Sequence, residues 1–545
     1  MIKKIIISIL LIVSFSRANY NDLLEIYKSD FDNIDPDKTL TLLQKNKDFA
    51  ISSYVALKMA SYFYYQKNFS KARDFLRYVD SKAILKDDFP FYLYIQSNLN
   101  QDFEGLKKLA TEFCYTYYGY KTYLQIYQTL TQTERVKAID NCIKNKHYEK
   151  AKNLLSTLED PDAINYLSIK LAKSKEEKIN FFKNIQPSSP YYQEAFSIVA
   201  NLDKDLENQY LSYLLENNYL ERYKSFLTAK AKKAFYTQNY NDFLFYADLL
   251  ESYTNLPEEI VWLKFLYFYK NKEQEKAKYY LNLYKKYEKD RYKTLYWQAL
   301  LENSQITVLH EPLKPEEITP YLALIYYKNK MLPIIKKERK CSLEPDSTAL
   351  LIKDLRESNY KLAYLEANYY IKTKPCERLY DIMPEVAVKC FGQNSQCSYV
   401  KPFTKLSDKD MEDVVYAVIK QESFFDPYAV SWSNAVGLTQ FIPKTAKWTA
   451  QNLKVDNFDM TDLFNPKLSI DFSVWYLSRL IKMFDGELIY VFASYNSGEN
   501  AVKKFLEKNN PKDLAEFIEF YPYDETRDYT KKVLRNYIIY KALGD

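Results

Sequence analysis

The chain has 545 residues, enough for several domains, and only 7 of them are glycine. Strand-rich folds need glycine at tight turns and bulges, so this scarcity favours helices joined by short connections. The formal net charge is +6, and it falls to +3 without residues 1–18, which hold Lys3, Lys4 and Arg17 and no acid. That excess is too small to indicate a nucleic-acid-binding protein, although it is compatible with an anionic polymer as a partner.

The N-terminus has the pattern of an export signal. Lys3 and Lys4 follow Met1-Ile2, the run from Ile5 to Phe15 is apolar apart from serines, and Ser16-Arg17-Ala18 places small residues where a signal peptidase cleaves. The apolar run is too short for a stable membrane anchor. We therefore predict that residues 1–18 are a signal peptide, and that the mature protein works outside the cytoplasm without an integral membrane segment.

The six cysteines all follow this segment, at positions 114, 142, 341, 376, 390 and 397. An even number of cysteines in an oxidising compartment predicts disulfides, and Cys390–Cys397 is the most local pairing, although the sequence leaves the pairing open. The chain has only two histidines and no CxxC motif. A zinc site or a histidine-based catalytic triad is therefore not expected.

From about residue 20 to 375 the sequence is typical of consecutive amphipathic helices. A degenerate motif recurs at 67–76, 145–155 and 271–281, each time with Lys-Ala placed ahead of a leucine and after a turn-prone asparagine. A small alanine lets the two helices of a hairpin approach closely, as in α-solenoids. We predict an all-α protein with an α-superhelical solenoid of helical hairpins.

The composition changes near residue 400. Four of the seven glycines and three of the five tryptophans follow this point, which indicates a compact domain with specialised turns. The expected domains are a superhelical domain at 19–311, a helical linker domain with cysteines at 312–398 and a compact C-terminal domain at 399–545.

The segment 411–427 carries the first candidate for chemistry. Its apolar residues recur at helical spacing, and Glu422 extends the same face, whereas Glu412, Lys420 and Gln421 fall toward the wetter side. Asp426-Pro427 is expected to end the helix. Burial and the negative end of the helix dipole should both raise the pKa of a glutamate at this place, as a proton donor requires.

Three further motifs follow in order. SWSNAVGLTQF at 431–441 contains Gly437 and Gln440, where a glycine suggests a special backbone angle or the close approach of a ligand. ASYNSG at 493–498 is a polar, aromatic break suited to a cleft wall. PYDETRDYTKKV at 522–533 begins the last helix with Glu525, Arg527 and Tyr529.

The order QES, GLTQF, ASYNSG and YDETRDY resembles the catalytic domain of the soluble lytic transglycosylases, over about 145 residues of this chain. The resemblance implies a goose-type-lysozyme-like fold for residues 399–545, behind an N-terminal helical superhelix. It implies peptidoglycan glycan strands as the substrate and the periplasm as the location. It implies no cofactor and no metal, and it leaves protein partners from the cell-wall machinery open.

The resemblance also assigns site residues. Glu422 matches the single catalytic acid and base. The residues expected to bind substrate are Ser431, Gln440, Tyr495, Asn496 and Glu525. Thr439 and Ser494 depart from the methionine and alanine common in the family, and we expect both to change the surface of the cleft wall.

The implied reaction cleaves the bond between N-acetylmuramic acid and N-acetylglucosamine without water and leaves a 1,6-anhydro end. Ordinary glycosidases use two carboxylates, and the nearest second acid here is Asp426, which a helix-ending Asp-Pro already explains. Two alternatives remain open: a lysozyme-like hydrolase that activates water, and a non-catalytic helical scaffold that only binds the cell wall.

Overall fold

The computed structural model describes residues 19–287, 290–306, 311–336, 340–431 and 433–544, so the predicted signal peptide lies outside the described residues. All regular secondary structure within these ranges is helical, and β pairing is limited to isolated bridges. The predicted all-α fold is therefore confirmed. Within the same ranges, no helix combines the length and the apolar character that a membrane span requires.

Contacts group the residues into two compact units. Unit 1 consists of Met1–Tyr223 with Pro345–Pro375, and unit 2 of Lys224–Glu344 with Cys376–Asp545. These units describe packing, and the domain boundaries expected after residues 18, 311 and 398 stay predictions.

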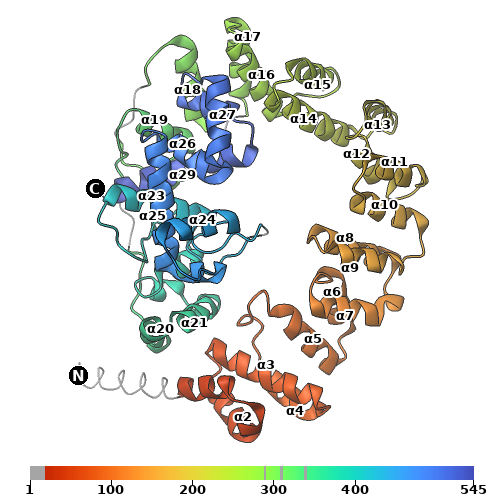
Figure 1. Cartoon of the computed structure of the whole chain (residues 1–545), viewed down its shortest axis with the longest axis vertical. Coiled ribbons are helices and arrows are strands. Elements are labelled where there is room, and N and C mark those ends of the chain that lie inside the picture. The colour runs from red at the N-terminus through yellow and green to blue at the C-terminus, as the bar shows by residue number, and fades with distance from the viewer. Residues whose placement is uncertain (1–18, 288–289, 307–310, 337–339, 432, 545) are drawn as a thin grey trace. The chain divides into compact units, whose positions relative to one another are not determined.

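Unit 1 is built from short helices that follow one another closely along the chain (Figure 1). Besides the helical residues 19–28, its α-helices are α2 (Pro36–Lys45), α3 (Ala50–Tyr65), α4 (Phe69–Leu76), α5 (Phe89–Asn100), α6 (Phe103–Glu112), α7 (Tyr117–Ile126), α8 (Gln132–Lys144), α9 (Tyr148–Leu155), α10 (Pro161–Leu171), α11 (Lys175–Lys183), α12 (Tyr192–Val199), α13 (Lys204–Glu216), α20 (Ser347–Ser358) and α21 (Tyr360–Thr373).

The recurring sequence motif forms the predicted helical hairpins in both units. Its alanine is fully buried in α4, in α9 and in α17 (Gln274–Tyr284), where each helix packs on the one before it. The turn in each hairpin contains a lysine with a left-handed backbone, at Lys67, Lys146 and Lys272. A non-glycine residue in this conformation is uncommon, and the repeated geometry shows that the same turn joins each helix pair.

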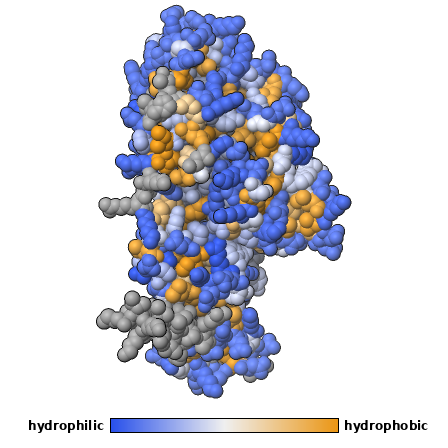
Figure 2. All heavy atoms as spheres, turned by 90° about the vertical axis from the view of Figure 1, so that its left-hand side faces the viewer, coloured by the Kyte–Doolittle hydropathy of each residue, from blue (hydrophilic) through white to orange (hydrophobic). Residues whose placement is uncertain are grey.

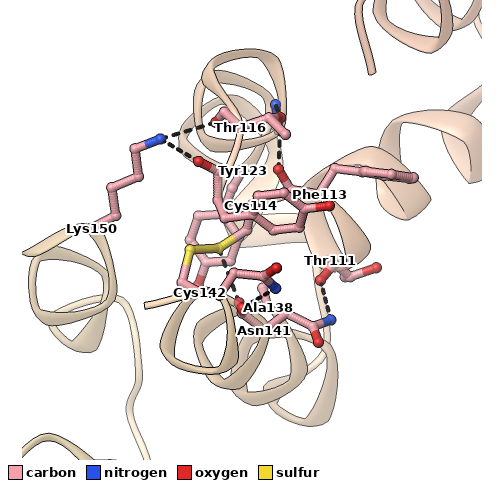
Figure 3. Close-up of a disulfide and its surroundings, with 12 residues drawn as sticks. Thr111, Phe113, Cys114, Thr116, Tyr123, Ala138, Asn141, Cys142 and Lys150 are labelled. Atoms are coloured by element: carbon pink, nitrogen blue, oxygen red, sulfur yellow. Dashed lines mark hydrogen bonds between the residues drawn. A yellow bond between two sulfur atoms is a disulfide. The ribbon is translucent and has the colours of Figure 1, made fainter. Parts of the chain in front are cut away.

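Two helical hairpins of unit 1 are also joined covalently. Figure 3 shows the Cys114–Cys142 disulfide, which links the end of α6 to α8. Around it, the Asn141 side chain donates to the Thr111 carbonyl at 2.9 Å, and Lys150 Nζ on α9 donates to the Tyr115 carbonyl at 2.6 Å. The disulfide and these hydrogen bonds fix the position of one hairpin relative to the next.

A buried carboxylate joins the two chain segments of unit 1. Glu366 on α21 accepts hydrogen bonds from the backbone amides of Ala50 at 2.7 Å and Ile51 at 3.0 Å, which begin α3. The residue before α3, Phe49, offers no side-chain cap of its own. Burial raises the pKa of Glu366 to about 7, although the two amides favour its charged form. Glu366 therefore caps α3 from 316 residues away in the sequence.

We expect Glu366→Leu to lower the unfolding free energy by about 2–4 kcal/mol, because it leaves two buried amides without acceptors. Thermal and urea unfolding, followed by circular dichroism, measure the change. Glu357→Leu, at an exposed position on α20, is the matched control and should leave stability nearly unchanged. Equal stability of the two variants would contradict the capping role.

Unit 2 combines further hairpins with the C-terminal domain. Its α-helices are most of α14 (Leu220–Tyr236), α15 (Tyr240–Tyr253), α16 (Glu258–Lys270), α17, α18 (Arg291–Glu302), α19 (Pro320–Lys328), α22 (Pro384–Ala387), α23 (Lys409–Glu422), α24 (Pro443–Leu453), α25 (Pro466–Met483), α26 (Leu488–Ser497), α27 (Glu499–Asn509), α28 (Leu514–Phe520) and α29 (Asp524–Gly544).

A buried glutamate joins the hairpins of unit 2 to the C-terminal domain. Glu519 on α28 accepts hydrogen bonds from Trp262 Nε1 at 2.9 Å and the Tyr321 hydroxyl at 3.0 Å, and it pairs with Lys531 at 3.2 Å. Burial alone would raise the pKa of this carboxyl, but Lys531 and Lys293 hold it below its ordinary range. The C-terminal domain is thus held to α16 and α19 by hydrogen bonds between residues 257 and 198 positions apart in the sequence.

All six cysteines form disulfides, as predicted, but the most local pairing is wrong. Cys390 pairs with Cys376 and Cys397 with Cys341, so Cys390–Cys397 does not form. The two bonds tie the segment that leads into the C-terminal domain to the residues after α19 and α21, instead of closing a short loop.

Apolar side chains also reach the surface. On the face drawn in Figure 2, hydrophilic residues divide the exposed apolar residues into separate patches. Some large aromatic side chains, such as Tyr117 and Tyr253, are also exposed, which is ordinary for a folded protein.

Candidate active site

The helix that carries Glu422 is α23, and its sequence explains both its start and its buried face. Asp408 caps the first turn by accepting a hydrogen bond from the Met411 amide at 3.1 Å. Val415, Val418 and Ile419 are fully buried, and α23 packs against α25 and α29. Glu422 is the last residue of the helix and lies partly buried on that face, as predicted.

The end of α23 differs from the prediction. The helix stops at Glu422 and not at Asp426-Pro427, because Phe424 and Phe425 take left-handed backbone conformations with φ of 49° and 67°. Two bulky residues in this region are strained, and the surrounding structure must hold them there. The chain therefore turns away immediately after Glu422, which exposes one side of its carboxyl group to the adjacent pocket.

The prediction that Glu412 and Lys420 lie on the solvent-facing side of α23 is also wrong. Glu412 and Lys420 are only 8% and 6% exposed, because the segment that precedes α23 folds over them. Glu412 pairs with Lys401 at 2.8 Å, and Lys420 Nζ donates to the Ser398 carbonyl at 2.7 Å. Periodicity alone could not place this covering segment, since it has no helical pattern.

A pocket of about 490 Å³ lies beside Glu422. It brings together all six residues that the sequence singled out, from four separate parts of the C-terminal domain. These are Glu422, Ser431, Gln440, Tyr495, Asn496 and Glu525. Their individual roles stay predictions.

The loop from 429 to 441 forms one wall of the pocket. Isolated antiparallel bridges join Val436 to Val430 and to Phe441. Gly437 has a φ of 81°, and a Cβ atom at this position would lie 2.4 Å from the Leu463 carbonyl oxygen. Both the backbone angle and the close approach therefore require glycine, as the sequence suggested.

Two polar side chains of this loop face the pocket with part of their hydrogen-bonding capacity already used. Ser431 Oγ accepts from the backbone amide of Ala435 at 3.1 Å, so its position is fixed. Gln440 Nε2 donates to the carbonyls of Ala429 and Gly437 at 3.1 and 2.8 Å. Gln440 is thus held with its carbonyl oxygen as the group that remains to accept a hydrogen bond from a ligand.

Tyr495 and Asn496 end α26 on the opposite wall. The Tyr495 hydroxyl donates to the Thr439 carbonyl at 2.9 Å and so joins this helix to the loop. Asn496 Oδ1 accepts from Thr526 Oγ1 on α29 at 2.6 Å. Gly498, with φ of 86°, follows α26 and allows the chain to turn into α27. Both side chains are therefore fixed by bonds outside the pocket.

The two departures from the family pattern do not change the pocket surface as expected. The side chains of Thr439 and Ser494 are both 0% exposed. Thr439 Oγ1 accepts from Ser473 Oγ at 2.7 Å inside the domain, and only its carbonyl contacts a pocket residue. The substitutions therefore affect the packing behind the walls.

Burial raises the pKa of Glu422 to about 7. The Tyr529 hydroxyl opposes this effect because it stabilises the charged form, and the negative charge of Glu525 adds to it. Burial also keeps Tyr529 protonated by raising its own pKa, so its phenol can only donate to a carboxylate here. The predicted increase in the pKa of Glu422 is confirmed.

The structure also places the other candidate carboxylates. Asp426 does not line the pocket: its Oδ1 accepts from the Tyr428 amide at 2.9 Å, as in a turn. Glu525 does line the pocket and is exposed at the start of α29. A second carboxylate is therefore present near Glu422, and it is the one that the motifs selected for substrate binding.

Two tyrosines at the site had no role assigned from the sequence. Tyr529 is buried one helical turn after Glu525 on α29 and faces Glu422, while Tyr476 on α25 lines the pocket. The sequence did contain a signal for Tyr529, because it follows Glu525 by four residues and residues four apart lie on the same face of a helix. Nothing in the sequence distinguishes Tyr476 from the many tyrosines that fill helix contacts.

Among the described residues, no three His, Cys, Asp or Glu side chains are grouped so that they could hold a metal ion.

Fold and site together define a helical-hairpin protein that ends in a compact helical domain with one buried carboxyl group at its pocket. Residues 403–518 match the family model of the transglycosylase SLT domain. This part of the chain is thus similar to the family whose motifs it resembles. Glu525 and Tyr529 follow the matched residues.

A putative soluble lytic murein transglycosylase from Haemophilus influenzae is 37% identical over 128 residues, 23% of this chain and 22% of that protein. The alignment thus spans only about a fifth of that relative's length.

Two solved structures match far more of the chain. The 70 kDa soluble lytic transglycosylase from Escherichia coli aligns with a TM-score of 0.60 and 14% identity, over 96% of this chain and 91% of that one. An inactive glutamate-to-glutamine mutant of lytic transglycosylase Slt from Pseudomonas aeruginosa aligns with a TM-score of 0.58 and 15% identity, over 97% and 92%. At these identities the likeness shows the fold.

The two neighbours of Glu422 should shift its titration in opposite directions. Tyr529→Phe removes a donor to the carboxylate, so the pKa of Glu422 should rise above about 7. Glu525→Gln removes a like charge, so the pKa should fall. Carbon-13 NMR of glutamate-labelled protein measures both, with the resonance assigned by its loss in Glu422→Gln. Shifts in the same direction would contradict the described electrostatics.

Proposed function

We propose that this protein is a peptidoglycan lytic transglycosylase, which cleaves the β-1,4 bond between N-acetylmuramic acid and N-acetylglucosamine. Glu422 acts first as the general acid and then as the general base. The products carry 1,6-anhydro ends. The predicted signal peptide and the substrate together favour the periplasm as the place of action.

The proton transfers balance with a single carboxyl group. Protonated Glu422 donates to the glycosidic oxygen as the bond to C1 of the muramic acid breaks, which frees the hydroxyl of the departing sugar. The neighbouring N-acetyl group stabilises the positive charge that develops at C1. Glu422, now ionised, takes the proton from the C6 hydroxyl, whose oxygen attacks C1. The enzyme returns to its protonated state without consuming water or needing a cofactor.

The observation that carries the proposal is the state of Glu422. Burial raises its pKa to about 7, so a large part of the population is protonated near neutral pH and the conjugate base is still accessible. The likeness to an inactive glutamate mutant of a lytic transglycosylase is consistent with a single essential carboxyl group. The side chains around Glu422 offer hydrogen-bond acceptors and donors suited to acetamido sugars.

The main alternative is a lysozyme-like hydrolase with Glu525 as its second carboxylate, since this residue lines the same pocket. Two points favour the transglycosylase. Glu525 is exposed and follows the residues of the family match, and its charge raises the pKa of Glu422 as a like charge does. A non-catalytic cell-wall-binding scaffold is the other alternative, but Glu422, unlike the buried helix cap Glu366, faces a pocket and accepts no backbone hydrogen bond from the described residues that would explain its burial there.

We expect Glu422→Gln to lower the rate of peptidoglycan cleavage by about 100- to 10,000-fold, because it removes the proton donor but keeps the shape of the side chain. Glu525→Gln should keep measurable cleavage, with the main effect on KM, because Glu525 contacts substrate without exchanging protons. Release of soluble muropeptides from purified sacculi measures both rates. Unchanged melting temperatures serve as the control for folding.

Each variant can contradict the proposal. Normal activity of Glu422→Gln would exclude Glu422 as the acid. Equal inactivity of Glu525→Gln in kcat would favour a two-carboxylate hydrolase.

A further inference from the structure

Lys420 lies two residues before Glu422 on α23, and its environment is unusual for a lysine. Its Nζ donates to the carbonyl and the hydroxyl of Ser398 at 2.7 and 2.9 Å. The same ammonium lies over the rings of Tyr399, Phe424 and Phe425, at 4.2, 4.9 and 5.8 Å from their centroids. No carboxylate among the described residues pairs with it.

A buried cation without a counter-ion is costly, so the groups that hold it must be fixed in place. Burial lowers the pKa of Lys420 to about 7, and Arg535 lowers it further through charge repulsion. Among the described residues, the carbonyl and hydroxyl of Ser398 and the three ring faces are the side-chain and loop contacts that compensate its charge, together with the negative end of the α23 dipole. Removing any one of these groups should make the position of the Lys420 ammonium group less well fixed.

Two of these rings belong to the strained residues that follow Glu422. Phe424 and Phe425 hold left-handed backbone angles, which are strained and persist only where the surroundings enforce them. Lys420 contacts both rings from the preceding turn of the same helix. It therefore helps to fix the point at which α23 ends, and with it the direction of the Glu422 side chain.

The segment that receives Lys420 is held from outside the C-terminal helices. Ser398 ends a short 3-10 helix, Gln396–Ser398, and follows Cys397 directly. Cys397 is bonded to Cys341, 56 residues earlier in the chain. The disulfide thus fixes the peptide whose carbonyl accepts from Lys420.

We propose that Lys420 is a positioning residue for Glu422, and that the Cys341–Cys397 disulfide holds the segment on which it rests. The proposal builds on the proposed function, because it assigns Glu422 the chemistry. Lys420 touches neither the substrate nor the reacting atoms. It acts by keeping the end of α23 and the two phenylalanines in one conformation, and a displacement of about 1 Å at a reacting group can cost a hundredfold in rate.

The first test replaces Lys420 while keeping its length. Lys420→Met should lower kcat by about 10- to 100-fold with little change in KM, because the carboxyl group is misdirected and the substrate contacts remain. Lys420→Arg, which keeps the charge and the donors, should restore part of the rate. Lys409→Met, at an exposed position on the same helix, is the matched control and should behave like the wild type.

The second test removes the disulfide that holds the Ser398 segment. Cys341→Ser with Cys397→Ser should also lower kcat, whereas Cys114→Ser with Cys142→Ser, which removes the disulfide of unit 1, should not. In a double-mutant cycle, Lys420→Met should cost less in the Cys341→Ser, Cys397→Ser background than in the wild type, because both changes release the same contact.

A third readout does not depend on activity. If Lys420 directs Glu422, then Lys420→Met should let the carboxyl group reach water and move its pKa from about 7 toward the ordinary range, as measured by carbon-13 NMR. Should Lys420→Met fail to fold, Ser398→Ala, which removes one acceptor only, should show the same changes in smaller degree.

The outcomes separate the two proposals. A wild-type protein that cleaves no peptidoglycan refutes the proposed function, while the NMR titration still tests Lys420. Wild-type kcat and an unchanged Glu422 pKa in Lys420→Met would overturn the positioning role. A rise in KM alone would assign Lys420 to substrate binding, and additive effects of the two changes would remove the disulfide from the proposal.

Discussion

The burial of one carboxyl group at the end of a helix is the constraint on which the site depends. For the proposed reaction, Glu422 must be removed from water far enough to hold a proton near neutral pH, and it must still face a pocket that is open to the substrate. A fully buried Glu422 would not reach the pocket, and a fully exposed Glu422 would have the ordinary pKa of a glutamate. The last residue of α23, followed at once by a sharp turn, meets both requirements.

Several parts of unit 2 hold Glu422 at the end of α23 and beside the pocket. The buried face of α23 rests on α25 and α29, and the left-handed turn at Phe424 and Phe425 carries the chain away from the carboxyl group. Gly437 allows the opposite loop to approach the Leu463 carbonyl, and the Tyr495 hydroxyl bonds this loop to α26. The walls of the pocket are therefore set by backbone geometry and buried hydrogen bonds, which leaves the facing side chains for the ligand.

The sequence predicted the features that depend on local pattern. Helical periodicity and the scarcity of glycine gave the all-α fold, the alanine–leucine motif gave the hairpins, and four ordered motifs identified residues that prove to line one pocket. The sequence did not predict the features that depend on contacts between distant segments of the chain. The burial of Lys420 comes from a covering segment without periodicity, and the Cys341–Cys397 pairing joins residues 56 positions apart. Tyr529 was visible in the last motif, but only the fold shows that it faces Glu422.

The central claim is that one carboxyl group suffices because the substrate supplies its own nucleophile. The most direct measurement is digestion of peptidoglycan in water enriched in oxygen-18, followed by mass spectrometry of the released muropeptides. A lytic transglycosylase should give ends that are lighter than reducing ends by one water and carry no heavy oxygen. Reducing ends that contain oxygen-18 would show that water attacks C1, and would contradict the account.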